Sequence, residues 1–158
     1  MNPPKCTSID LIADELIEVV DFFAARLVLI DEMSARHKPS EERWCIQEVV
    51  GHLVDSATNN HQRFIRALTS DVLDFPGYEQ NSWVKSQRYG DGSWNNLIQL
   101  WKTYNFHLAH VIRQIPDHKM RVKCTVGNNE PVSLSFLIED YLTHLKHHLN
   151  KINERTGI

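Results

Sequence analysis

Residues 46–68 read IQEVVGHLVDSATNNHQRFIRAL, and their apolar side chains recur at the spacing of one helix face. Similar patterns run through residues 8–35, 93–115 and 133–155. Thr7 or Ser8 can cap the first of these helices, and Ser93 can cap the third. Four amphipathic helices without a central sheet predict an all-α protein with the architecture of a four-helix bundle.

The connections between the helices predict their order in space. The break KPSEERW at residues 38–44 is short, which makes the first two helices antiparallel neighbours. Residues 70–92 contain a proline and three glycines and form a long crossover between the second and third helices. The order is then up-down-down-up, with the second and fourth helices antiparallel. Between the third and fourth helices, residues 118–132 alternate like strands around a GNN turn, which predicts a short hairpin.

The composition is that of one soluble domain over residues 1–158, with 42% apolar and 23% charged residues. A formal net charge of −3 argues against a nucleic-acid partner, and no apolar run approaches the roughly 20 residues that span a membrane. The first ten residues, MNPPKCTSID, lack the apolar core of a signal peptide, so we expect a cytoplasmic protein. Three widely spaced cysteines predict neither a disulfide framework nor a cysteine metal pair.

Nine histidines are the compositional signal to follow, and three of them lie in the segment THLKHH at residues 143–148. His144 and His148 are four residues apart, so both project from the same face of a helix and can meet at one metal ion. His147 points away from the apolar side of that helix. The pair by itself is a weak signal, and a metal site needs a third ligand from another helix.

The second helix offers two candidates for this ligand, His52 and His61. The helical wheel favours His61, which lies closer to the apolar side. Height along the bundle favours His52. It is about 9 Å from the start of its helix, and His148 and His144 are about 10 Å and about 16 Å from the end of the fourth helix. Because the two helices are antiparallel, these ends lie side by side. We give height more weight, because a change of rotamer can redirect a side chain around the helix axis but cannot move it two turns along the helix.

Three imidazoles on a divalent ion leave coordination positions open, which is typical of a catalytic zinc site. Such an ion can activate either a water for hydrolysis or a thiol for transfer. Asp55 and Asp140 share helix faces with the proposed ligands, but we expect solvated carboxylates there. Arg63 is also expected in solvent, and Cys45, alone at a helix start, is interpreted as structural rather than as a nucleophile.

The segment RWCIQEVVGHLVDSATNNHQRF (43–64), with its core Glu48-Val49, Gly51-His52-Leu53 and Asp55, resembles the DinB/YfiT-like superfamily. The segments PVSL (131–134), THLKHH (143–148) and PGYEQNSWVKSQRY (76–89) are similar to other parts of that family. Cys45 departs from the pattern, since the family has a hydroxyl residue as this N-cap, and the cap is expected to be weaker.

The resemblance implies an up-down-down-up bundle with one divalent metal ion, zinc or nickel, held by His52, His144 and His148. It further implies a small-molecule substrate and, in some members, a low-molecular-weight thiol as cofactor. Two functions stay open: a metal-dependent hydrolase or thiol S-transferase, and a non-catalytic metal-binding or stress-response module with the same fold. We also expect a homodimer, because the long connection carries apolar residues beyond what one bundle needs: Phe75, Tyr78, Trp83 and Tyr89.

Overall fold

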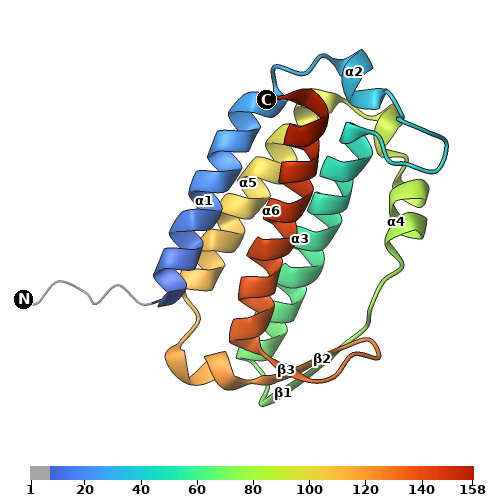
Figure 1. Cartoon of the computed structure of the whole chain (residues 1–158). Helices are drawn as coiled ribbons and strands as arrows, with labels where there is room; N and C mark the ends of the chain where they lie inside the picture. Colours follow the sequence, from blue (N-terminus) through green and yellow to red (C-terminus); the bar gives the residue numbers. More distant parts are fainter. Residues whose placement is uncertain (1–7) are drawn as a thin grey trace, which may run out of the picture.

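The structure, a computed structural model, describes residues 8–158, so the expected cap at Thr7 lies outside the described residues. Four long helices form the bundle: α1 (Ser8–Leu27), α3 (Ile46–Leu68), α5 (Trp94–Arg113) and α6 (Leu134–Thr156). In Figure 1, α1 and α6 run in one direction and α3 and α5 run in the other. The predicted up-down-down-up four-helix bundle is therefore confirmed, and α3 is antiparallel to α6.

The first helix is shorter than the predicted stretch of residues 8–35. It ends at Leu27, and a separate short helix, α2 (Glu32–Arg36), follows after a turn. The carboxylate of Asp31 accepts a hydrogen bond from the backbone N–H of Ser34 at 2.9 Å and so caps α2. The apolar periodicity continues across the turn, which is why the pattern alone predicted one helix.

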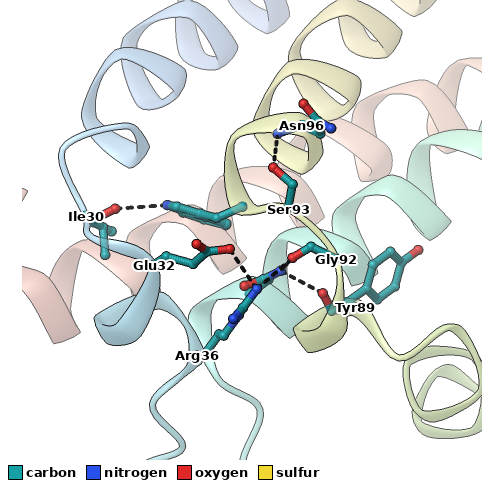
Figure 2. Close-up of polar contacts among 9 residues, drawn as sticks. Ile30, Glu32, Arg36, Tyr89, Gly92, Ser93 and Asn96 are labelled. Atoms are coloured by element: carbon teal, nitrogen blue, oxygen red, sulfur yellow. Dashed lines mark hydrogen bonds and ion pairs between the residues drawn. The ribbon is translucent and has the colours of Figure 1, made fainter.

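Contacts from this turn hold the start of α5 in place, as Figure 2 shows. The indole N–H of Trp94 donates to the carbonyl of Ile30 at 3.0 Å. Arg36 donates to the carbonyl of Gly92 at 3.0 Å and pairs with Glu32 at 2.7 Å. The far end of the crossover is therefore tied to the end of α1 and to α2.

The long connection between α3 and α5 is more ordered than its Pro/Gly-rich sequence predicted. It contains strand β1 (Val72–Phe75), helix α4 (Gln80–Gln87) and the 3₁₀ turn η1 (Tyr89–Asp91). Figure 1 shows that it travels along the outside of α3 from one end of the bundle to the other. The predicted crossover is thus present, and it covers a face of α3 that would otherwise be in solvent.

A small sheet lies across one end of the bundle (Figure 1). After the 3₁₀ turn η2 (Asp117–Arg121), strands β2 (Lys123–Val126) and β3 (Val132–Ser133) pair in antiparallel fashion. This pairing is the predicted hairpin. Strand β1 adds parallel to β2, which the all-α prediction did not include, because parallel pairing joins segments far apart in the sequence.

The core lies between the four helices, where Phe64 and Trp101 are fully buried. Ser93 and Ser133 cap α5 and α6 with their side-chain oxygens. Nearly every residue of α3 from 46 to 60 is buried, including polar ones, because the crossover packs on the side away from the core. Within residues 8–158, no helix has both the length and the apolar character needed to cross a membrane.

Candidate metal centre

Two antiparallel helices bring three histidines to one point. His52 projects from α3, and His144 and His148 project from successive turns of α6. The Nε2 atom of His144 lies 3.3 Å from that of His52 and 3.2 Å from that of His148. One ring nitrogen from each histidine falls within 4.8 Å of the other two. The two helices therefore place the three side chains at the same height, as the topology argument required.

The other histidines considered from the sequence add no ring nitrogen to this cluster. His61 Nδ1 makes a hydrogen bond with the Tyr104 hydroxyl at 2.8 Å, and its ring packs edge-on against His107. His147 is exposed, as the helical spacing predicted. His52, by contrast, is only 1% exposed. The helical wheel misjudged His52, because it did not allow for cover by Trp44, which precedes α3 and whose ring lies 5.0 Å from that of His52.

The contacts around His144 fit a cation better than a hydrogen-bond network. A neutral imidazole nitrogen either carries one proton or offers one lone pair, so the Nε2 of His144 can form only one good hydrogen bond. It nevertheless has two nitrogen neighbours, at 3.3 Å and 3.2 Å. Ligands about 2.0–2.1 Å from a tetrahedral zinc ion stand roughly 3.3 Å from each other. The donor set and its spacing therefore match a bound divalent ion.

Burial keeps the three imidazoles neutral, which is the form that binds metals. It lowers the pKa of His52 to about 4, with a further contribution from the charge of His144. It likewise lowers the pKa of His148 to about 3, helped by His144 and His52. Burial also lowers the pKa of His144, against the opposing charge of Asp140. All three lone pairs are thus available at neutral pH.

The two aspartates considered from the sequence have different environments. Asp55 is buried, contrary to expectation, and one of its oxygens accepts hydrogen bonds from Tyr89 and Gln87, each at 2.7 Å. Burial raises the pKa of this carboxyl, and the two donors partly offset that rise. Asp140 is exposed, as expected. Neither carboxylate makes a hydrogen bond to a histidine within the part of the chain that the structure describes.

Ser56 is the residue that sequence reasoning missed next to the centre. Its hydroxyl lies 3.5 Å from His144 Nδ1. The tautomer of His144 that donates its Nδ1–H to this hydroxyl leaves the Nε2 lone pair directed at the other histidines. Ser56 follows His52 by one helical turn, so spacing along the helix was the signal available to find it.

Glycine at position 51 allows the crossover to approach α3 closely. A Cβ added there would overlap the ring of Tyr89. The same tyrosine donates its hydroxyl to Asp55, and its backbone carbonyl accepts a hydrogen bond from the buried amide of Gln47 at 2.7 Å. The 3₁₀ turn of the crossover is thus pinned to the face of α3 that carries Gln47, Gly51 and Asp55.

Two hollows reach the histidines. A cleft of about 230 Å³ is lined by His52 and His144 together with polar groups: Ser56, Asn60, Arg63, Tyr78, Gln80, Asp140 and Tyr141. A second hollow, of about 420 Å³, reaches His148 past Trp44 and Ile152. The centre is therefore accessible to small molecules, although His52 itself is buried.

Cys45 does not have the environment of a nucleophile. It is 2% exposed, and burial raises the pKa of its thiol. Its sulfur accepts from the backbone N–H of Glu48 at 3.4 Å, and the Glu48 carboxylate accepts from the Cys45 N–H at 2.9 Å. A complete capping box therefore forms around this cysteine, and its role is structural, as the sequence indicated.

Known proteins resemble this chain over most of its length. The sequence model of the DinB superfamily matches residues 13–152. Two curated relatives carry the name "Putative metal-dependent hydrolase". The one from Halalkalibacterium halodurans is 22% identical over 130 residues, which cover 82% of this chain and 75% of the relative. The other, YfiT from Bacillus subtilis, is 25% identical over 114 residues, which cover 70% of this chain and 63% of that protein.

Two solved structures have the same fold. YfiT from Bacillus subtilis, described as "a probable metal-dependent hydrolase with an unusual four-helix bundle topology", matches with a TM-score of 0.76 and 20% identity. The match covers 99% of this chain and 94% of YfiT. A mycothiol-dependent maleylpyruvate isomerase matches with a TM-score of 0.71 and 13% identity over 94% of this chain and 62% of that one. At these identities the likeness concerns the fold.

Proposed function

The chain belongs to the DinB superfamily, and from this premise we propose that it is a metal-dependent enzyme acting on a small molecule. Its metal ligands are His52, His144 and His148. The observation that carries the proposal is the position of His144 Nε2, 3.3 Å and 3.2 Å from the nitrogens of the two other histidines. Three neutral imidazoles whose ring nitrogens converge on one point can all direct their lone pairs at a single cation.

The side chains around the centre have separate tasks in this proposal. α3 and α6 hold the three imidazoles, and Ser56 fixes the tautomer of His144. Burial by Trp44, whose ring lies 5.0 Å from that of His52, excludes water from one side of the centre. When bound, a divalent ion supplies Lewis-acid activation of a water or a thiol.

Zinc and nickel are the proposed metals, because imidazole ligands suit both. A low-molecular-weight thiol is the proposed cofactor for a transfer reaction, and the fold shared with a mycothiol-dependent isomerase supports this choice. Hydrolysis is the alternative reaction, and the names of the curated relatives support it. Both reactions use a small-molecule substrate and the same three ligands.

A homodimer also remains our proposal, on altered grounds. Phe75, Tyr78 and Tyr89 are half-buried, so the crossover exposes less apolar surface than predicted. Apolar side chains just after α1 are more exposed, with Leu29 at 77% in the turn and Met33 at 81% in α2. Exposed apolar groups of this size favour association.

The test combines metal content with activity. Elemental analysis of the purified protein should find about one equivalent of zinc or nickel per chain. The protein is then assayed with and without metal against ester and amide substrates, and against thiol–electrophile pairs. Metal-dependent turnover supports the enzyme. Full metal content without turnover on any of these would favour the non-catalytic metal-binding module, and absence of metal would contradict both.

A further inference from the structure

One side of α3 continues from the metal centre as a row of polar residues. His52, Ser56, Asn60 and Arg63 follow each other at intervals of four, four and three, so they lie on one helix face. All four line the same cleft of about 230 Å³. The row begins at the buried histidine and ends at a charged side chain, which gives the cleft two chemically different ends.

Arg63 was expected in solvent, but it is half-buried, and its guanidinium makes no salt bridge with a carboxylate of the described residues. Its Nη1 donates to the side-chain carbonyl of Asn60 at 3.3 Å. Its Nε is buried with no hydrogen-bond partner, and its guanidinium lies 5.4 Å from the ring centre of Phe75. A desolvated cation of this kind is costly unless a partner arrives.

Tyr78 supplies a second donor in the same cleft. Burial raises the pKa of its phenol to about 12, with Asp55 adding to the effect and Arg63 opposing it. The hydroxyl therefore keeps its proton at neutral pH. Within the described part of the chain it has no hydrogen-bond partner, and its ring packs against Trp83 at 4.7 Å between centroids. Arg63 and Tyr78 thus present unused N–H and O–H groups to one space.

We propose that this end of the cleft binds the carboxylate of a small organic acid, through Arg63 and Tyr78. The inference rests on the proposed function, because the other end of the acid reaches the histidine centre. A guanidinium fork matches the two oxygens of a carboxylate. Asp140 lines the same cleft and opposes further negative charge, so a monoanion fits better than a phosphate dianion.

The dimensions limit the size of this acid. The volume of the cleft, about 230 Å³, lies below the roughly 300–1,000 Å³ of sites for drug-sized ligands. The α-carbons of His52 and Arg63 are separated by about 16 Å along the helix axis. A long side chain on a helix leans back toward the helix start, which brings the guanidinium nearer to the centre. The ligand is therefore a short, extended acid rather than a compact one.

The test uses zinc-loaded protein and thiol probes that differ in one charge. The acids are mercaptopropionate and mercaptohexanoate, and the uncharged controls are mercaptopropanol and mercaptohexanol. Calorimetric titration should show at least one acid binding about tenfold more tightly than its alcohol, as expected for hydrogen bonds to a charged group. Arg63→Gln should remove this preference and leave the affinity for the alcohols unchanged. Arg66→Gln is the matched control, because Arg66 is an exposed arginine on the same helix, and it should keep the preference.

Equal affinity for acid and alcohol in the unmodified protein, or a preference that survives Arg63→Gln, would overturn the inference while leaving the metal centre intact. A protein that binds no zinc contradicts the proposed function instead. In that case the subsite is read from the NMR signal of the Arg63 Nε–H in the metal-free protein. A shift with the acids but not with the alcohols supports the carboxylate subsite, and no shift with either overturns it.

Discussion

The Nε2 atom of His52 lies 3.3 Å from that of His144, although 92 positions separate the two residues. No local pattern could bring them together. The contact exists because the crossover makes α3 and α5 parallel, which leaves α3 antiparallel to α6 and puts the start of one beside the end of the other. The candidate metal centre is thus a direct product of the bundle order.

Replacing His52 by Ala should remove most of the metal from the protein. One of three ligands is lost, while the helical circular-dichroism signal should persist because the apolar core supplies the fold. His61→Ala and His147→Ala are the controls, since His61 bonds to Tyr104 and His147 is exposed. Elemental analysis of the three variants checks this. Metal lost from His61→Ala but retained in His52→Ala would disprove the ligand assignment.

Metal binding should persist to lower pH than free imidazoles would allow. Protons compete with the metal for the ring nitrogens, and a lowered pKa weakens that competition. The pKa values of His52 and His148 are lowered from 6.5 to about 4 and about 3. Protons therefore compete strongly with the metal only at a pH well below the ordinary imidazole pKa. Zinc affinity measured from neutral pH downward, against a competing chelator, checks this, and a steep loss beginning near 6.5 would contradict it.

Asp55→Asn should change how stability depends on pH. Burial raises the folded-state pKa of Asp55 above its reference of 3.8. A carboxyl with a raised pKa stabilises the fold most below the unfolded value, and this contribution is lost as pH rises through the folded pKa. The variant has no carboxyl at this position and does not lose this stability. Its free energy of unfolding should therefore rise relative to that of the unmodified protein as pH rises. Urea unfolding of the two metal-free proteins between acid and neutral pH measures the difference, which should not be constant.

Gly51→Ala should destabilise the protein by about 1–3 kcal/mol, the usual cost of overpacking. The added Cβ would overlap the Tyr89 ring and push its hydroxyl away from Asp55. Gly90→Ala is the matched control in the crossover, since a Cβ there meets nothing within 4 Å. It should change stability by less than about 0.5 kcal/mol. Denaturant midpoints for both variants decide the matter, and equal midpoints would show that Tyr89 is not held as described.

The homodimer prediction is checked by light scattering. A species of twice the 18.4 kDa chain mass is expected at micromolar concentrations. Met33→Glu should weaken it, because Met33 is 81% exposed on α2, whereas Trp83→Glu tests the crossover surface, where Trp83 is 40% exposed. A monomer alone at every concentration would contradict the prediction.

Several features could be predicted from the sequence because they depend on local spacing. The bounds of α3, the cap at Ser93, and the shared face of His144 and His148 follow from helical geometry and from side-chain chemistry within one turn. The length of the connection after α3 predicted the helix order, and the order predicted that His52 and not His61 would lie level with the pair.

Other features were decided only by the tertiary structure. The pairing of β1 with β2, the burial of Asp55 and the surroundings of Arg63 in the cleft all depend on where the crossover runs. The burial of His52 depends on Trp44 and on the packing of α3 against α6. Helical periodicity shows only which face of a helix packs on the core. It therefore predicts that polar residues on the other faces lie in solvent. Here a distant segment covers the other side of α3, and contacts between distant segments are set by the path of the chain in space.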